Sequence, residues 1–371
     1  MLAQYPWLQK TYQFLVDSYH NAKAHHAYLF IYEGQIGQEH LFNLFTRFLL
    51  CKENHNREQI YPCGQCRACQ AYNLNSNSDL YDLQQGDASK NISIDSVRTM
   101  IERIELEPVT SAQNVVTIYD ASKLNVYSAN AMLKTLEEPP SHTHFIIGLP
   151  SGYSVLPTIR SRCMVLNLDK PTDEQIEEFL TVQEIHQPNR AYLKALAPKQ
   201  PALMLKMQQK EFPQKFIELN FKLHELFNTL EVANFIETFA ANDIEVFTWQ
   251  VEALSQIFTY IGKRFLVLGH PTQDSLELVL SYETDSSLYQ TVDYLSKNLG
   301  DLDNVDKLYD LVERLQVIKT QLVHFSPQLA GENSLKGIAY KIASLIALFT
   351  YSLMNSSNPE EFYLKQLQKQ D

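Results

Sequence analysis

Four of the five cysteines of this 371-residue chain fall in one short segment, and their spacing suits metal binding. The segment reads C-K-E-N-H-N-R-E-Q-I-Y-P-C-G-Q-C-R-A-C, and it holds Cys51, Cys63, Cys66 and Cys69. Two overlapping C-x-x-C steps let three thiolates face one point from a tight turn, and Cys51 can supply a fourth. Four thiolates form the closed tetrahedral set that suits structural Zn²⁺ and leaves no position for a catalytic water. We therefore predict a structural zinc site.

Two other interpretations of this segment remain open. A redox C-x-x-C motif or a disulfide pair would explain two thiols, whereas the segment contains four. His55 lies within the segment and could replace Cys51 as a ligand.

A second candidate site follows an apolar run at Ala27–Tyr32. The run continues into E-G-Q-I-G-Q-E-H, in which Gly34 and Gly37 mark a turn before a helical segment. A P-loop occupies this position in nucleotide-binding proteins, but it requires a lysine for the outer phosphates and a Ser or Thr for Mg²⁺. Gln38, Glu39 and a histidine stand there instead, and Glu39 would repel a phosphate. We interpret the turn as a degenerate P-loop or a plain strand-to-helix turn.

Three further parts of a nucleotide-hydrolysing site are missing. The next buried strand ends in Asp120 followed by an alanine, so the second carboxylate is absent and Asp120 is expected to be a cap or turn residue. A third strand ends in Leu149 followed by a proline, without a polar side chain to sense the γ-phosphate. No arginine occurs between Ala191 and Lys263, where a small helical domain would reach back to the nucleotide. We therefore expect no ATP hydrolysis by this chain.

The elements that must position these residues alternate between strands and helices up to residue 168. Short apolar runs predict buried strands, and a helical period of apolar residues predicts helices between them. This alternation is typical of a parallel sheet with helices on both faces. The predicted strands are 27–32, 114–119, 145–149 and 165–168, and the predicted helices are 8–19, 41–51, 94–106 and 129–138. Ser93 or Asp95 can cap the helix at 94–106, and the helix at 129–138 stops at Pro139-Pro140.

After residue 168 the pattern becomes helical throughout. Thr172 or Asp173 can cap a first helix, and short helices are expected as far as residue 211. The rest of the chain has long helical periodicity, as at Phe216, Leu219, Leu223 and Phe227. The apolar segment 341–354 is too short for a membrane span and is predicted to be a buried bundle helix, and the polar tail after residue 355 is expected to fray.

Two blocks of sequence resemble a known family. They read S-A-N-A-M-L-K-T-L-E-E-P-P, at residues 128–140, and L-P-T-I-R-S-R-C, at residues 156–163. Together with Tyr5-Pro6-Trp7 and the cysteine segment, they resemble the clamp-loader branch of the AAA+ family. The resemblance covers residues 1–210 well, whereas the remainder agrees only in its helical character and is longer than expected.

The resemblance implies a fold, partners and a site. It implies an α/β RecA-like AAA+ domain with a zinc insert at residues 1–168, a small helical lid at 169–211 and a helical collar for oligomerisation at 212–371. It also implies a ring of five subunits with the γ or τ ATPase subunits and the δ subunit, which loads the β clamp onto primed DNA. In that family the Ser-Arg-Cys motif, here Ser161, Arg162 and Cys163, faces the next subunit, and its arginine reaches ATP held by the neighbour.

The arginine has a physical rationale and two alternatives. A guanidinium can stabilise charge that develops on a transferred phosphoryl group, acting from a neighbouring chain. Arg162 could instead pair with a surface carboxylate, and Arg160 is a weaker candidate for the role. On the helix before Pro139-Pro140, Lys134, Glu137 and Glu138 could form a solvated face, with Lys134 paired to Glu138, or pack against the Ser-Arg-Cys motif.

Bulk properties narrow the remaining functions. The net charge of −12 does not favour a free-standing DNA binder, which usually has a basic balance. No signal peptide is expected at the N-terminus, and unpaired cysteines indicate a reducing cytosol, so we predict a cytoplasmic protein without a membrane partner. An active ATPase with an unusual P-loop and a zinc-module nucleic-acid binder remain the alternative functions.

Overall fold

The computed structural model describes residues 2–56, 58–84, 91–266, 291–292, 302–324 and 332–354. The chain divides into two compact units. The first contains Met1–Glu184 and Lys199–Leu203, and the second contains Ile185–Pro198 and Met204–Asp371. Residues of the predicted lid, 169–211, therefore occur in both units, and the division into three domains stays a prediction. The polar tail after residue 355 lies outside the described residues.

The first unit is built on a parallel sheet of five strands in the order β2-β3-β4-β1-β5. The strand β1 pairs with both β4 and β5, and its Leu29 is in register with Ile147 of β4 and with Val165 of β5. The four strands predicted from apolar runs are all present. The fifth, β2, has only three residues, L-Y-D, and was not predicted. The bounds are β1 Ala27–Tyr32, β2 Leu80–Asp82, β3 Asn114–Ile118, β4 Thr143–Pro150 and β5 Met164–Asn167.

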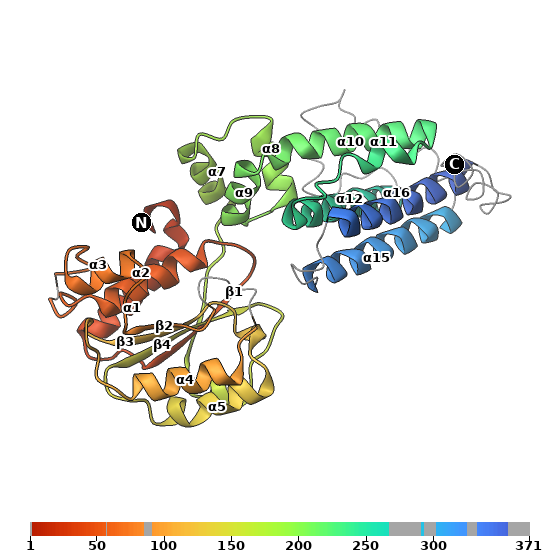
Figure 1. Ribbon diagram of the computed structural model, residues 1–371. Helices are drawn as coiled ribbons and strands as arrows, with labels where there is room; N and C mark the ends of the chain where they lie inside the picture. Colours follow the sequence, from red (N-terminus) through yellow and green to blue (C-terminus); the bar gives the residue numbers. More distant parts are fainter. Residues whose placement is uncertain are drawn as a thin grey trace. The chain divides into compact units, whose positions relative to one another are not determined.

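Helices cover both faces of the sheet, as predicted (Figure 1). On one face lie α1 (Gln9–His20), α2 (Gln38–Leu50) and α3 (Arg67–Asn73), and on the other lie α4 (Ile94–Ile104) and α5 (Val126–Glu137). Alternate side chains of β1 serve the two faces. The ring of Phe30 packs 5.1 Å from that of Phe42 in α2, whereas Leu29 belongs to the core formed with α4 and α5.

Side-chain caps fix where several helices begin. Ser93, and not Asp95, caps α4 by accepting a hydrogen bond from the Ser96 N–H at 3.1 Å. Asn125 caps α5, so that this helix starts three residues before the predicted Ala129. Thr172 forms a reciprocal capping box with Gln175 at the start of α7 (Asp173–Val182).

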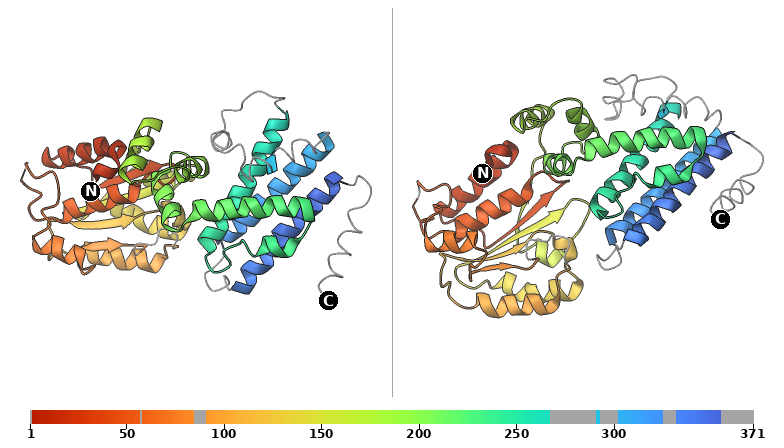
Figure 2. Two further views of the ribbon diagram at one scale, coloured as in Figure 1. Left: turned by 90° about the horizontal axis from the view of Figure 1, so that it is seen from above. Right: turned by 45° about the horizontal axis from the view of Figure 1, so that its top comes forward.

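The described part of the second unit is helical (Figure 2). Its long helices bury aliphatic and aromatic residues at the predicted helical spacing, including Phe216 and Leu223. The predicted buried helix at 341–354 forms the end of α16, where Ile342 and Ile346 are fully buried. Its helices are α8 (Asn189–Leu196), α10 (Phe212–Thr229), α11 (Val232–Ile236), α12 (Ile244–Leu266), α15 (Leu302–His324) and α16 (Glu332–Met354), while α9 (Pro201–Gln209) has residues in both units.

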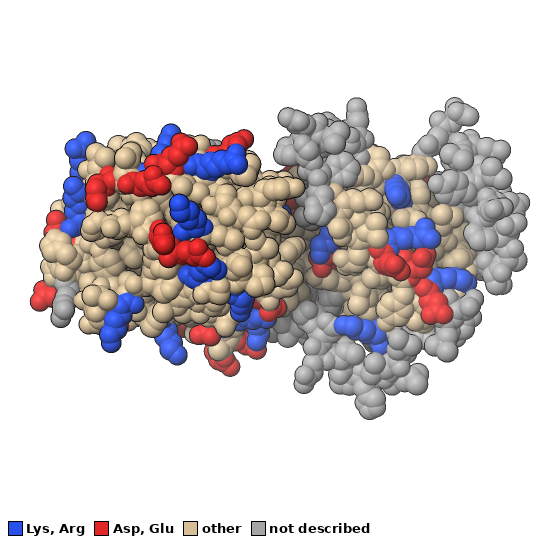
Figure 3. Space-filling model, turned by 90° about the horizontal axis from the view of Figure 1, so that it is seen from below, with Lys and Arg blue, Asp and Glu red and all other residues tan. Residues whose placement is uncertain are grey.

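None of the described helices is both long and apolar enough to cross a membrane. Charged residues of both signs are interspersed on the face drawn in Figure 3, on the first unit and on the second. That face therefore has no continuous stripe of one sign among its described residues.

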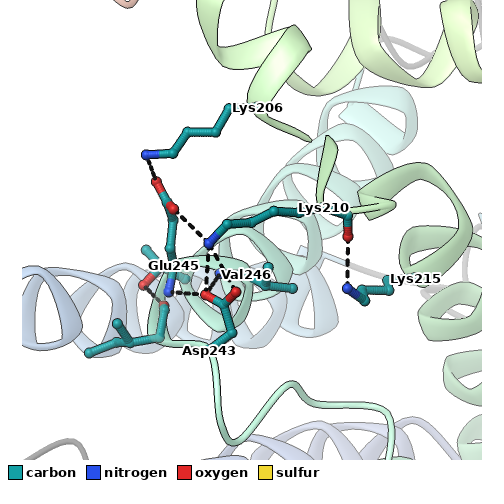
Figure 4. Close-up of polar contacts among 8 residues, drawn as sticks. Lys206, Lys210, Lys215, Asp243, Glu245 and Val246 are labelled. Atoms are coloured by element: carbon teal, nitrogen blue, oxygen red, sulfur yellow. Dashed lines mark hydrogen bonds and ion pairs between the residues drawn. The ribbon is translucent and has the colours of Figure 1, made fainter. Parts of the chain in front are cut away.

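An ion cluster joins α9 to the start of α12 within the second unit (Figure 4). The ammonium of Lys210 lies 2.9 Å from Asp243 and 2.8 Å from Glu245, and Lys206 contacts Glu245 at 2.5 Å. Asp243 also accepts hydrogen bonds from the N–H groups of Glu245 and Val246, so it caps α12. Burial alone would lower the pKa of Lys210, but the two carboxylates outweigh it and raise the pKa.

Candidate functional site

The four cysteines of the predicted zinc site come together in the first unit. Cys51 follows the last residue of α2, Cys63 lies in the loop, Cys66 is the N-cap of α3, and Cys69 is within α3. Their sulfur atoms all lie within 4.8 Å of one another. The Cys63 and Cys69 sulfurs are 4.0 Å apart, and those of Cys66 and Cys51 are 3.9 Å apart. A tetrahedral site with Zn–S bonds of about 2.3 Å requires sulfurs about 3.8 Å apart, so the donor set fits zinc.

The surroundings of the sulfurs also suit thiolates. Backbone N–H groups point at two of them: that of Cys63 lies 3.4 Å from the Cys51 sulfur, and that of Cys66 lies 3.3 Å from the Cys63 sulfur. All five cysteines are free thiols, so the disulfide interpretation is not supported. His55 is exposed, and its Nδ1 contacts the Lys52 carbonyl at 2.8 Å; it does not belong to the cluster.

The turn at Gly34 and Gly37, which the sequence predicts to be a degenerate P-loop or a plain turn, is tight and is covered by other parts of the first unit. Gly34 and Gly37 both have positive φ angles, 71° and 87°, which favour glycine. A Cβ at Gly34 would lie 2.7 Å from Cγ of Gln200, and one at Gly37 would lie 2.4 Å from the ring of Tyr5. The Gln200 side chain accepts a hydrogen bond from the Gln35 N–H, and the Ala202 N–H donates to the Gln35 carbonyl.

The side chains that replace the P-loop lysine and serine serve the fold. Gln38 is buried, and its Oε1 accepts a hydrogen bond from the Ile36 N–H at 3.1 Å. His40 stacks on Tyr5 with ring centroids 4.7 Å apart, and Trp7 donates to the Ile36 carbonyl at 2.9 Å. Gln38, His40 and Trp7 therefore all make contacts within the fold at this turn.

The carboxylate that follows β3, that of Asp120, takes part in a local turn. Asp120 Oδ1 accepts a hydrogen bond from the Ser122 N–H at 2.9 Å and caps a short 3-10 helix, as predicted. The Asp120 N–H in turn donates to the side chain of Gln84, which is fully buried. Sequence reasoning missed Gln84, because a lone glutamine after a three-residue strand has no pattern. The same end of β3 approaches β4 so closely that a Cβ at Gly148 would lie 2.3 Å from the Tyr119 carbonyl oxygen.

Arg162 lies two residues after α6 (Pro157–Arg160), between the α6 C-cap Ser161 and the first residues of β5. One terminal nitrogen, Nη1, donates to the Thr158 carbonyl at 2.8 Å and lies 3.4 Å from Ser161 Oγ. The other, Nη2, forms an ion pair with Oε1 of Glu137, at the end of α5. The alternative of a pair with a surface carboxylate is thus present within the chain, and Arg162 keeps 28% of its side chain exposed.

The two glutamates at the end of α5 differ in their contacts with the Ser-Arg-Cys motif. Glu137 packs against the Ser-Arg-Cys motif, whereas Glu138 is exposed, and no ion pair joins it to Lys134 in the part of the chain described.

Cys163 is buried below the surface at the start of β5, away from the cysteine cluster, and burial raises the pKa of its thiol to about 11. Cys163 is therefore a packed core residue.

Comparison with known proteins finds a family that this part of the chain matches. Residues 7–172 match the model of the family described as DNA polymerase III, delta subunit. This segment contains the sheet, the cysteine cluster and Arg162, and the match confirms the clamp-loader resemblance predicted from the sequence.

The relatives narrow the resemblance to one kind of clamp-loader subunit. The chain is 34% identical over 214 residues to DNA polymerase III subunit delta' of Haemophilus influenzae, a match that covers 57% of this chain and 64% of the relative. It is 33% identical over 192 residues to subunit delta' of Escherichia coli, covering 52% of this chain and 56% of the relative. The chain thus spans less than two thirds of the length of these two relatives.

Another relative carries the name of a different subunit of DNA polymerase III. The chain is 29% identical over 184 residues to DNA polymerase III subunit tau/gamma of Haemophilus influenzae, covering 47% of this chain and 26% of the relative.

Proposed function

We propose that this chain is a non-catalytic clamp-loader subunit of the δ′ type. It would act as a stator that supports the loading of the β sliding clamp onto primed DNA. The observation that carries this proposal is the match of residues 7–172 to the DNA polymerase III delta subunit family, together with relatives named subunit delta'. Its partners would be the γ or τ ATPase subunits and the δ subunit in one cytoplasmic complex, and it would meet the clamp and DNA through that complex.

In this proposal the chain does not hydrolyse ATP. The turn at Gly34 and Gly37 is in contact with Gln200 and Tyr5, so a phosphate group would have to displace both side chains. Asp120, which follows β3, caps a helical turn. A hydrolase needs a cradle for the phosphates and carboxylates for Mg²⁺ and water, and these contacts support a site that has lost both.

The chemistry that the chain supplies is a cation for a neighbour's ATP site. The guanidinium of Arg162 is planar and permanently charged, and its terminal nitrogens can donate to two oxygens of a transferred phosphoryl group. Ser161 and Cys163 hold the ends of this short segment at the C-terminus of α6 and the start of β5. Engagement requires that Arg162 exchange its contact with Glu137 for the phosphate.

Zinc would have a structural role. Cys51, Cys63, Cys66 and Cys69 would hold one ion as thiolates, and the ion would tie the end of α2 to α3. Protein sulfur would fill all four coordination positions of the ion, so the zinc would neither act as a Lewis acid nor activate a water molecule.

Reconstitution of the complex with variant subunits tests the arginine. We expect Arg162→Ala to leave the complex assembled and to slow clamp-dependent ATP turnover by the partner subunits by about 10³-fold or more at the site it faces, since a trans arginine is worth about 10³- to 10⁵-fold in kcat. Arg160→Ala is the matched control, because Arg160 is exposed and lies two residues away.

Assembly is monitored by size-exclusion chromatography, so that loss of turnover is not confused with loss of the subunit. Unchanged turnover in an assembled Arg162→Ala complex would refute the trans role of Arg162. A loss of turnover with Arg160→Ala alone would assign the role to Arg160.

A further inference from the structure

The hydrogen-bond donors of Arg162 are used unevenly. Nη1 donates to the Thr158 carbonyl at 2.8 Å, a contact within its own turn. Nε is buried and has no hydrogen-bond partner. Only Nη2 reaches another element, where it pairs with Glu137. Glu137 is therefore the one charged group that fixes the direction of the guanidinium among the described residues.

Glu137 occupies an electrostatically unfavourable position unless a cation is near. It is the last residue of α5, and the C-terminus of a helix carries a partial negative charge that repels a carboxylate. Glu138, which follows it, adds a second negative charge. Arg162 offsets this repulsion, so each partner of the pair favours the other in the isolated chain.

The pair is also exposed enough to be broken. The Glu137 side chain is 48% exposed and that of Arg162 is 28% exposed. Ion pairs at such positions contribute little free energy, because water screens both charges. A terminal phosphate of a nucleotide has more negative charge than one carboxylate, and it can replace Glu137 as the acceptor of the same Nη2 donor.

We propose that Glu137 is a positioning residue that holds Arg162 ready and gives it up to the terminal phosphate of ATP bound by a neighbouring subunit. This inference rests on the proposed function. In the unengaged state the carboxylate keeps the guanidinium directed along the surface between α5 and α6. On engagement the phosphate competes with Glu137 for Arg162, so the carboxylate weakens ATP binding at the neighbour's site.

Steady-state ATP turnover of the reconstituted complex tests the competition. We expect Glu137→Gln, which removes the charge and keeps the shape, to lower KM for ATP about threefold, and to leave kcat within about twofold, since an exposed pair is weak. Glu102→Gln is the matched control, because Glu102 is an exposed residue of the neighbouring helix α4 and forms no ion pair in the part of the chain described. It should leave both constants unchanged.

The double variant shows whether the effect passes through Arg162. Glu137→Gln should have no effect in an Arg162→Ala background, because there is then no guanidinium to release. The inference is overturned by an unchanged KM in Glu137→Gln, by a fall in kcat of more than about twofold in that variant, or by the same change of KM in the Arg162→Ala background.

Failure of this inference is distinguishable from failure of the proposed function. If Arg162→Ala leaves turnover unchanged, the trans arginine is wrong and the role of Glu137 falls with it. If Arg162→Ala slows turnover but Glu137→Gln does not change KM, Arg162 acts without a competing carboxylate, and only the positioning role is refuted.

Discussion

Asp79 is a buried carboxylate that fixes the loop leading into β3. Its two oxygens accept hydrogen bonds from the N–H groups of Val109, Thr110 and Ser111 at 3.0, 2.7 and 2.6 Å. Burial alone would raise the pKa of Asp79, but these three donors outweigh it and hold the pKa below its usual value. The ionised carboxylate therefore stabilises the folded chain.

We expect Asp79→Asn to lower the free energy of unfolding at pH 7 by about 2 kcal/mol, because hydrogen bonds to a charged acceptor are lost. The folded pKa is depressed, so this contribution is complete above the unfolded pKa of about 3.9 and is lost as the pH falls through the lower folded value. The difference between the unfolding energies of parent and variant, measured with denaturant from pH 7 to pH 3, should begin to shrink below about pH 4. An equal difference at both ends would contradict this role, and Asp95→Asn, an exposed change, is the control.

At the degenerate P-loop, Glu39→Lys places a cation where a P-loop would need one. We expect no ATP turnover by the purified variant, since Asp120 is followed by alanine and the turn stays covered by Gln200 and Tyr5. Glu39 lies in the first turn of α2, so the change should also cost about 0.3–1 kcal/mol of stability by loss of a favourable helix-dipole interaction. Release of labelled phosphate measures turnover. Hydrolysis above the parent would mean that one charge alone had disabled the site.

The candidate site residues can be found in the sequence where they depend on local spacing. The four cysteines and Arg162 lie in short motifs, and Asp120 was expected as a cap. The contacts that these residues make with distant parts of the chain were not predictable. Glu137 is 25 residues from Arg162 in the sequence, and Gln200 is 165 residues from Gln35, so only the folded chain brings them together.

Among the elements, the cysteine segment joins α2 to α3, and hydrogen bonds and ring stacking also hold this region against neighbouring elements. The Tyr12 hydroxyl of α1 donates to the Ile60 carbonyl at 2.7 Å, and the ring of Tyr12 stacks on that of Tyr61. On the other side, the hydroxyls of Tyr72 in α3 and Tyr119 at the end of β3 both donate to the side chain of Asn43. Loss of the metal ion should therefore loosen a segment that contacts two layers of the first unit.

We expect Cys66→Ser to bind less than one zinc per chain and to lower the thermal midpoint by about 5 °C or more. Metal binding and folding are coupled, and about 1 kcal/mol shifts a domain of this size by about 2–4 °C. Elemental analysis and thermal unfolding give the two measurements. A chelator should destabilise the parent and have no further effect on the variant. Absence of zinc from the purified parent protein would refute the tetrathiolate site.

The elements themselves were largely predictable, because long apolar runs and clear helical periods require burial. The strands β1, β3, β4 and β5 and helices α1, α2 and α4 follow this rule within a few residues. Two misses have physical reasons. The strand β2 is too short to show alternation, and it is held by pairing with β3. The helix α5 begins at Val126 because Asn125 supplies a cap that the apolar pattern does not record.

At the scale of the whole molecule, the charge argues for protein partners. The net charge is −12, and acidic and basic residues are interspersed on the face drawn in Figure 3. Affinity for DNA requires cations that neutralise phosphates and release counterions. In the proposed complex, contact with primed DNA would therefore come from the assembly as a whole.

We expect the isolated chain to bind primed DNA with a Kd weaker than about 10⁻⁴ M at about 150 mM salt, beyond the usual range for non-specific binding. The complex reconstituted with its ATPase partners and clamp should bind the same DNA tightly. Fluorescence anisotropy with labelled primed DNA, repeated over a range of salt concentrations, measures both. Submicromolar binding by the lone chain, with a steep salt dependence that Cys66→Ser abolishes, would contradict this expectation. The cysteine segment would then itself supply the phosphate contacts, and the result would favour a zinc-module nucleic-acid binder over a clamp-loader stator.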